Sequence, residues 1–159
     1  MTDIVPKEQI KKLSMDIEKI FTEENFPEEE PGYLDAARHF IAQGISTRDY
    51  GFFFTRAAGI YNEAVGTFRR GHKRNVTEAD FKNNSLGRNF SYTEESKPYF
   101  KFIDEAIIDP ESLTKERKDS LMNLVKKNAV YAPIGTIDDM SRSGRYNPSR
   151  IIKFLKDAY

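Results

Sequence analysis

Apolar residues recur at helical spacing over residues 47–70, the longest regularly patterned stretch of the chain. They follow one another at intervals of three and four residues, as the a and d positions of a packed helix do. Ser46 or Thr47 can cap the start of such a helix, and Gly71 lies where a left-handed C-terminal residue belongs. The pattern predicts a central core helix with an apolar stripe made of Gly51, Phe54, Ala58, Tyr61, Val65 and Phe68.

Weaker stripes of the same period predict further helices on both sides of the central one. We expect them over about residues 6–22, 33–43, 98–108, 110–127 and 147–158, with short helices over 77–83 and 136–141. Gly44 is expected to end the helix over 33–43, because glycine is common just beyond a helix C-terminus. Residues 83–91, NNSLGRNFS, are predicted to form a loop.

These elements predict an all-α fold. A chain of 159 residues suits one domain, so residues 1–159 are expected to form a single compact domain of about six to eight helices packed around the helix over 47–70. Residues 23–32 contain five glutamates, two prolines and a glycine, and are predicted to be an acidic connector within that domain. Residues 136–159 are predicted to be a C-terminal helix pair.

The composition excludes several classes of protein. There is no cysteine, so disulfides, thiol catalysis and cysteine metal sites are excluded. No apolar run approaches the roughly 18 residues of a membrane span, and the N-terminus has no apolar signal segment. We therefore expect a cytoplasmic protein without a membrane partner.

Charge is balanced over the whole chain but alternates in blocks. Residues 1–35 carry a net charge of −6, residues 36–76 of +5, residues 77–109 of −3 and residues 110–159 of +4. Such alternation favours complementary surfaces, within the fold or between subunits. It argues against a globally basic nucleic-acid-binding protein, although a local basic patch stays compatible with it.

The sequence shows no convincing catalytic constellation, and it predicts no enzyme, no cofactor and no metal centre. Asp35 and His39 lie four residues apart, a spacing at which a carboxylate and an imidazole can share a metal ion. No second motif of the kind found in helical metal sites accompanies them. A solvent-facing His39 is therefore expected. The other histidine, His72, has no recognisable partner in the sequence either.

The central helix also carries glycines that suggest close packing. Gly59 and Gly66 lie seven residues apart, and glycine within a helix costs roughly 0.5–1 kcal/mol relative to alanine. A second backbone packing closely against them would explain their presence. The simpler interpretation is a core helix. The alternative is a seam that binds a protein partner or a second copy of the chain, and it consists of Gly51, Phe54, Ala58, Gly59, Tyr61 and Gly66.

Basic residues gather at two places. In the C-terminal pair, a turn with Gly144 would place polar and basic side chains at the start of the second helix, where helix-turn-helix proteins contact nucleic acid. The other cluster follows the central helix, where the helix dipole also favours cations. The alternative for the C-terminal pair is simple docking on the core. The predicted nucleic-acid contacts are Arg142, Arg145, Asn147, Ser149, Arg150, Lys153 and Lys156, together with Arg69, Arg70, Lys73 and Arg74.

Three functions are compatible with these patterns. The preferred one is a non-enzymatic adaptor or structural subunit of a larger complex, a class that includes viral and phage components, with a protein partner or self-association. The alternative is a DNA- or RNA-binding protein that uses the C-terminal helix pair. The third is an enzyme whose site is assembled from distant residues, which a pocket that holds His39 or His72 beside buried carboxylates would favour.

Overall fold

The structure is a computed structural model that describes residues 7–27, 32–70 and 74–129, with the end of the third helix and the start of the fourth given by their backbone. It confirms the all-α prediction: 82% of the described residues lie in six α-helices, and none of them lies in a strand. The helices are α1 (Lys7–Ile20), α2 (Tyr33–Tyr50), α3 (Phe52–Arg70), α4 (Arg74–Phe90), α5 (Ser96–Ile108) and α6 (Lys115–Asn128), with a short 3₁₀ helix, η1 (Pro110–Ser112), before α6.

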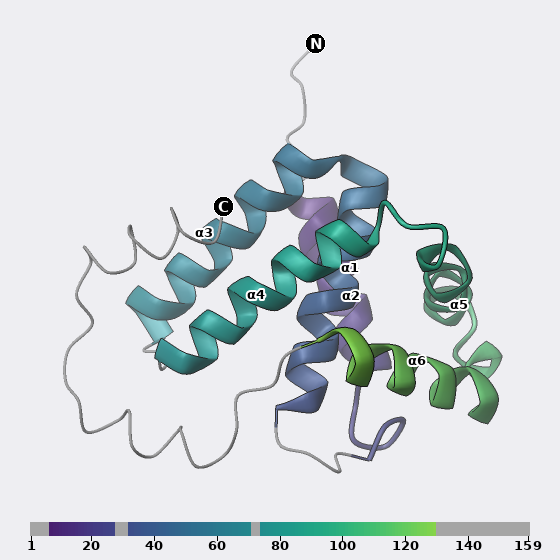
Figure 1. Cartoon of the computed structure of the whole chain (residues 1–159). Coiled ribbons are helices and arrows are strands. Elements are labelled where there is room, and N and C mark those ends of the chain that lie inside the picture. Colours follow the sequence, from purple (N-terminus) through teal and green to yellow (C-terminus); the bar gives the residue numbers. More distant parts are fainter. Residues whose placement is uncertain (1–6, 28–31, 71–73, 130–159) are drawn as a thin grey trace.

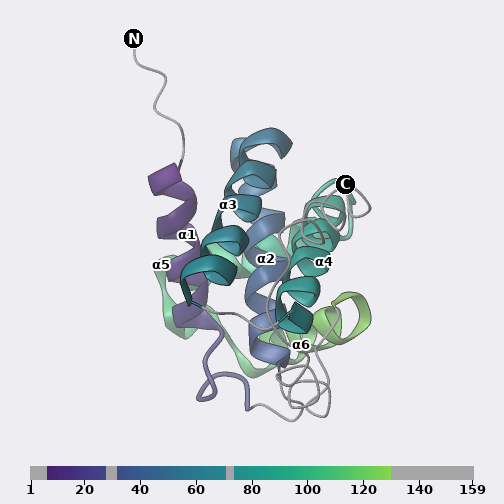
Figure 2. The ribbon, with the colours of Figure 1, turned by 90° about the vertical axis from the view of Figure 1, so that its left-hand side faces the viewer.

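The helix at the centre of the fold is α2, because it packs against α4, α3, α1 and α6. In Figure 1 α4 crosses in front of α2, and the perpendicular view of Figure 2 shows α2 between α1 and α4. Most of its residues from Tyr33 to Thr47 are buried. The helix predicted over 47–70 is present as α3, but it begins at Phe52 and is not the central helix, because residues 47–50 belong to α2.

Gly51 separates α2 from α3. Its φ of +84° lies in a region open mainly to glycine, and its N–H donates a hydrogen bond to the carbonyl oxygen of Thr47 at 3.0 Å. Over its described side chains, the predicted apolar stripe of α3 is not a core stripe either. Phe54 and Tyr61 are 50% and 56% exposed, whereas Thr55, the residue after Phe54, is fully buried. The chain turns at Gly51, and these two aromatic residues of the stripe lie outside the core.

The α4 helix packs closely against α2 at Gly87. A Cβ atom placed on Gly87 would lie 2.1 Å from the carbonyl oxygen of Phe40 and 3.2 Å from the backbone nitrogen of Gly44. Gly44 therefore does not end α2, as predicted; it lies inside the helix, where a Cβ would meet the Phe100 ring at 2.6 Å. The predicted loop over 83–91 is wrong for the same reason, since residues 83–90 are helical and pack against α2.

Aromatic rings fill the core next to this contact between α2 and α4. Phe90, near the end of α4, lies 5.3 Å from Phe40 and 5.9 Å from Phe100 between ring centroids. Phe21 and Phe26, on the segment that follows α1, stack at 4.9 Å. All five rings are at least nine-tenths buried, so they carry much of the hydrophobic stabilisation of the fold.

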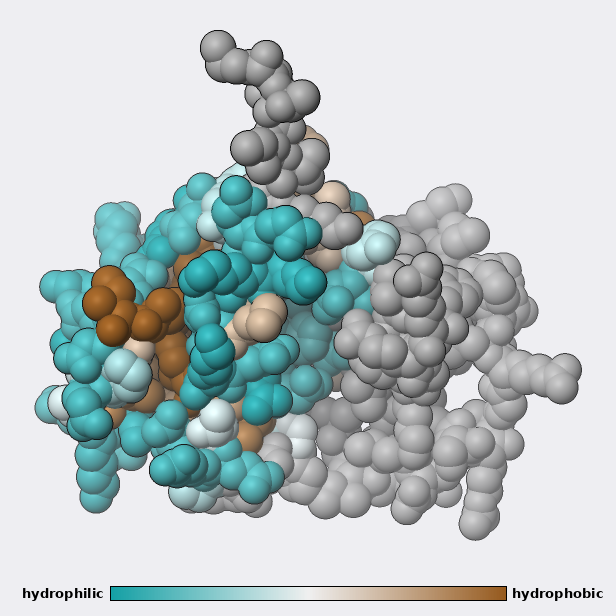
Figure 3. Space-filling model, turned by 180° about the vertical axis from the view of Figure 1, so that it is seen from behind, coloured by the Kyte–Doolittle hydropathy of each residue, from teal (hydrophilic) through white to brown (hydrophobic). Residues whose placement is uncertain are grey.

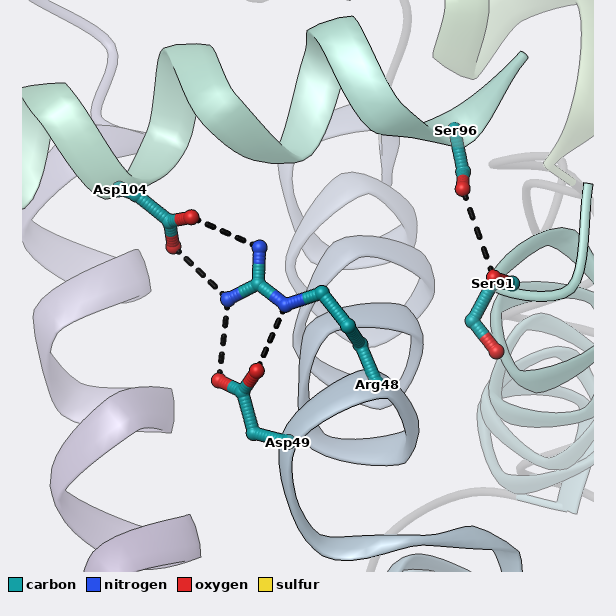
Figure 4. A network of polar contacts seen from close by, with 5 residues as sticks. All are labelled: Arg48, Asp49, Ser91, Ser96 and Asp104. Carbon is teal, nitrogen blue, oxygen red and sulfur yellow. Dashed lines mark hydrogen bonds and ion pairs between the residues drawn. The ribbon is translucent and has the colours of Figure 1, made fainter. Parts of the chain in front are cut away.

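An arginine at the end of α2 holds α5 in place (Figure 4). Arg48 donates two hydrogen bonds to the Asp104 carboxylate at 2.7 and 3.0 Å, and two to Asp49 at 2.6 and 3.0 Å. The hydrogen bonds to Asp49 and Asp104 raise the pKa of the guanidinium above its ordinary value. The Arg48 guanidinium also lies 5.7 Å from the Phe100 ring centroid, so it links α2 to α5 by charge and by packing.

The surface is mostly polar, with local apolar exposure. Figure 3 shows one brown area on the side of the molecule where α5 and α6 lie in Figure 1. The two most exposed large apolar side chains of the described part are Ile108 at the end of α5 and Phe53 at the start of α3, at 87% and 84%. Among the described helices, none combines the length and the apolar character that a membrane crossing requires.

Candidate functional site

Three side chains that can bind a metal ion meet between α2 and α4. Asp35 and His39 come from successive turns of α2, and Asp80 comes from α4. One ligand atom of each residue lies within 4.8 Å of the other two. The His39 Nε2 atom lies 3.5 Å from the Asp80 Oδ1 atom and 3.9 Å from the Asp35 Oδ1 atom. The imidazole nitrogen thus faces two carboxylates from two helices.

The cluster is one end of a polar seam between two helices. Side chains three and four residues apart lie on one helix face, and each helix contributes three polar residues at a spacing of four: Asp35, His39 and Gln43 on α2, and Asp80, Asn84 and Arg88 on α4. The His39 Nδ1 atom lies 2.9 Å from the Asn84 Oδ1 atom, and the Arg88 Nη1 atom donates to the Gln43 Oε1 atom at 3.0 Å. Residue numbers rise together along both helices, so α2 and α4 run in the same direction.

The glycine contact described above sets the separation of the two helices at this seam. Asn84 lies one turn before Gly87 on α4, and Asp80 lies one turn earlier still. Because the backbones touch at Gly87, short side chains such as aspartate and asparagine reach across to α2. A wider separation of α2 and α4 would move both of them away from His39.

Asn84 fixes the proton on the His39 ring. The Asn84 Oδ1 atom can only accept a hydrogen bond, so the His39 Nδ1 atom carries the proton of the contact. In the neutral imidazole, the Nε2 atom then has its lone pair directed at the two aspartates. Histidines that bind metals almost always donate their other N–H to an oxygen in this way, because that contact orients the ring.

The separations within the cluster suit a metal ion better than direct ion pairs. Charge-assisted hydrogen bonds are usually about 2.7–2.9 Å long, so 3.5 and 3.9 Å are long for them. Ligands on a tetrahedral ion with bonds of about 2.0–2.2 Å lie about 3.4 Å from one another. The three residues therefore need only small side-chain movements to bind one ion.

Burial increases from one side of the cluster to the other. The Asp35 side chain is 50% exposed, that of His39 20% and that of Asp80 4%. The prediction of a solvent-facing His39 is therefore wrong. An ion at this place would bind Asp80 on its buried side, where the low dielectric strengthens the attraction between the ion and the carboxylate. Solvent and ligands would reach the ion from the exposed side, next to Asp35.

A pocket with a volume of about 460 Å³ opens beside the cluster, between α1, α2 and α3. Asp35, His39 and Asn84 form part of its polar lining, and Phe54 and Ala58 of α3 belong to its apolar wall. This volume lies within the range of small-molecule sites, about 300–1,000 Å³. The enzyme hypothesis named a deep pocket that holds a histidine beside buried carboxylates. His39 lines this pocket and lies beside one buried carboxylate, that of Asp80, so the hypothesis stays a prediction.

The other predicted site residues fall in different places. Four residues of the predicted seam line the pocket: Phe54, Ala58, Gly59 and Tyr61. Gly51 lies in the exposed turn before α3, and Gly66 lies in the part of α3 that is described by its backbone alone. Asp80 and Asn84 are the site residues that the sequence analysis missed. Their spacing of four, matched to that of Asp35 and His39, is the signal in the sequence that could have revealed them. Several predicted nucleic-acid contacts and one histidine lie outside the described residues: Lys73, Arg142, Arg145, Asn147, Ser149, Arg150, Lys153, Lys156 and His72. The side chains of Arg69, Arg70 and Arg74 also lie outside the description.

Comparison with protein-family models, with curated proteins and with solved structures finds no match for this chain. The function of the pocket and of the three-residue cluster is therefore inferred from their geometry and chemistry.

Proposed function

We propose that the chain binds a divalent metal ion through Asp35, His39 and Asp80, and that the ion holds a small ligand in the adjacent pocket. The observation that carries this proposal is the meeting of one imidazole and two carboxylates, from two helices, within 4.8 Å of one another. Asp35 and His39 also line the pocket, so an ion bound to them is accessible to a ligand.

The number of ligands supports a ligand-binding role for the ion over a purely structural one. Structural zinc sites are closed by four protein ligands, whereas sites that bind or activate a small molecule keep three protein ligands and an open position. The described residues provide three. The open position would face the pocket, because Asp80 holds the ion from the buried side.

The donor set also narrows the choice of ion. Imidazole suits zinc and iron, whereas carboxylates suit magnesium, calcium and manganese, so a mixed set of one imidazole and two carboxylates favours Zn²⁺, Mn²⁺ or Fe²⁺. Magnesium is expected to bind more weakly, because it prefers oxygen ligands and retains its water.

Calorimetric titration of the full chain with Zn²⁺ and with Mn²⁺ tests the proposal. Asp80→Asn and His39→Gln should each weaken binding by at least about 100-fold, since loss of a neighbouring group that only orients a ligand already costs about 10–100-fold. Asp119→Asn is the matched control, because Asp119 is exposed on α6. His72→Gln controls for adventitious binding by the only other histidine.

Thermal unfolding provides a second measurement. An ion at 100 times its Kd stabilises the folded state by about 2.7 kcal/mol, so the wild type and both controls should melt at a higher temperature with Zn²⁺, and the Asp80→Asn variant should not. The proposal is wrong if the wild type binds neither ion, or if His39→Gln and His72→Gln reduce binding equally.

The assembly role predicted from the sequence is a second candidate, and the exposed Phe53 supports it. That ring is 84% exposed at the start of α3, beside the half-exposed Phe54. A second copy of the chain would be the simplest partner. Light scattering of the purified protein should then show a dimer or larger species that Phe53→Ser dissociates, and a monomeric wild type would refute self-association.

Nucleic-acid binding by the basic clusters also stays a prediction. It is tested by the anisotropy of a labelled duplex at low and at physiological salt, since phosphate contacts weaken steeply as salt increases. Alanine at Arg145 and Arg150 should weaken such binding, and no binding at low salt would exclude it.

A further inference from the structure

One buried amide group lies at the border between the metal-binding cluster and the pocket. Asn84 is 1% exposed, its oxygen is engaged by His39, and its Nδ2 atom makes no hydrogen bond within the described structure. A buried N–H group without an acceptor is costly. Because Asn84 also lines the pocket, an acceptor atom of a bound molecule can provide the missing partner.

The binding of a metal ion would determine the type of group that Asn84 offers to this molecule. An ion on the His39 Nε2 atom keeps the proton on the Nδ1 atom, and that proton needs the Asn84 oxygen as its acceptor. The NH₂ group of the amide is therefore the part of Asn84 that is left to donate to a bound molecule. The bound molecule must then supply one oxygen to the ion and one acceptor to the amide. A carboxylate group has both.

The charges around the pocket also favour an anion. Asp35 and Asp80 balance the charge of a divalent ion. The other charged side chains that line the pocket among the described residues are Lys11, Arg38 and Glu18. They leave one positive charge, which a single carboxylate on the ligand neutralises.

The apolar part of the pocket lining determines which groups suit the rest of the ligand, beyond its carboxylate. This part of the lining includes Ile10 on α1 and Phe54, Ala57 and Ala58 on α3. An aliphatic or aromatic body packed against these side chains would remove apolar surface from water, including part of the half-exposed Phe54 ring.

We infer that the pocket takes a small monocarboxylic acid whose carboxylate bridges the metal ion and the Asn84 amide while its apolar body lies against α3. This inference rests on the proposed metal site. It adds a class of ligand to that site and a role for Asn84, which positions His39 with its oxygen and binds the ligand with its nitrogen.

The test compares 3-phenylpropanoate with its neutral analogue 3-phenylpropanamide, each titrated into the full chain loaded with Zn²⁺. The acid should bind at least about tenfold more tightly than the amide, because only the acid supplies a charged second oxygen. Binding of the acid should also require the metal ion. Equal affinity for the two compounds, or equal affinity of the acid for the metal-free and the Zn²⁺-loaded chain, would overturn the inference.

Asn84→Asp separates the two roles of this residue. The aspartate keeps an oxygen acceptor for the His39 Nδ1 atom, so Zn²⁺ affinity should increase several-fold as the imidazole becomes more basic. It removes the N–H donor and adds a negative charge, so affinity for 3-phenylpropanoate should fall at least about tenfold. These opposite changes would not result from a general disturbance of the fold.

Phe54→Ala provides a second variant in case a buried aspartate at position 84 prevents folding. It should weaken the binding of 3-phenylpropanoate several-fold, because Phe54 is half exposed and its ring is therefore available to the ligand. The two proposals fail in different ways. Absence of Zn²⁺ binding refutes both, whereas Zn²⁺ binding without binding of the acid, or with an acid affinity that Asn84→Asp leaves unchanged, refutes only the ligand class.

Discussion

Gly87→Ala is the substitution that most directly tests how the fold builds its site. The added Cβ would lie 2.1 Å from the carbonyl oxygen of Phe40, whereas ordinary contacts begin at 3.4 Å. The obstacle is backbone, so α4 has to move away from α2 by about 1.3 Å. Overpacking of this kind costs about 1–3 kcal/mol and occasionally more. The displacement also opens a gap between the two helices, and a gap of about 0.5–1 Å removes a quarter to a half of the energy of each dispersion contact. In the other direction, alanine stabilises the interior of a helix by about 1 kcal/mol relative to glycine. Because the obstacle is backbone, we expect the upper end of this balance, a net loss of about 2 kcal/mol in the free energy of unfolding.

Urea unfolding followed by circular dichroism measures this loss. Gly59→Ala is the matched control, since its Cβ would meet only the end of the flexible Gln43 side chain, at 3.0 Å. It makes the same change within a helix, and it should stay within about 1 kcal/mol of the wild type. If Gly87→Ala is as stable as Gly59→Ala, the close contact of α2 and α4 is not as described.

The same variant links the fold to the proposed metal site. Asp80 lies on α4 two turns before Gly87, and its ligand partners lie on α2, so separating the helices pulls the ligands apart. Metal–ligand distances tolerate only about 0.2 Å, which is much less than the expected displacement of the helix. Zn²⁺ affinity should fall at least about tenfold in Gly87→Ala, and unchanged affinity in a folded variant would show that the crossing does not position the cluster.

Three further predictions concern charge. Zn²⁺ affinity should decrease as the pH is lowered from about 7.5 to about 5.5, because imidazole and carboxylate ligands bind metals only when deprotonated. Calorimetric titration at the two pH values measures this decrease, and equal affinities would exclude His39 as a ligand. Arg48→Met should lower the free energy of unfolding in urea by about 1 kcal/mol, a modest value because the Arg48 side chain is 35% exposed. Arg48→Lys should restore only part of this stability, since lysine cannot form the two-bond contact with Asp104. Hydrogen bonds from Lys12 and Lys19 lower the pKa of the Asp16 carboxyl in the folded protein. The ionised Asp16 therefore stabilises the fold fully at a pH above the pKa that this carboxyl has in the unfolded chain, and the stabilisation is lost as the pH falls through the lowered pKa. In Asp16→Asn, the free energy of unfolding should therefore decline less steeply as the solution is acidified.

The helices that the sequence predicted well have one buried stripe each. For α1, α5 and α6, the apolar residues at spacings of three and four include the buried core residues, such as Ile17, Ile103 and Leu121. These helices lie at the outside of the fold and bury one face. A one-sided pattern is the signal that periodicity detects, so the predicted ranges agree with the structure to within a few residues.

The centre of the fold was predicted wrongly because two glycines have opposite roles. Gly44 was expected to end a helix, yet it lies inside α2 and allows Phe100 and α4 to approach closely. Gly51 was expected within a helix, yet it ends α2 with a positive φ. A glycine that ends a helix and one that makes room for a neighbour look alike in the local sequence. The difference depends on contacts with residues far along the chain.

The part of α4 that carries Asn84 and Gly87 was predicted as a loop, and the physical reason connects structure with proposed function. Asparagine, serine and glycine are weak helix formers, since their side chains compete for backbone hydrogen bonds or leave the backbone too mobile. In α4 these residue types have other tasks. Gly87 brings the helix against α2, and Asn84 reaches His39. Tertiary packing against α2 therefore compensates for the low propensity, and the stretch that conflicts most with local sequence rules is the one where a functional site is expected.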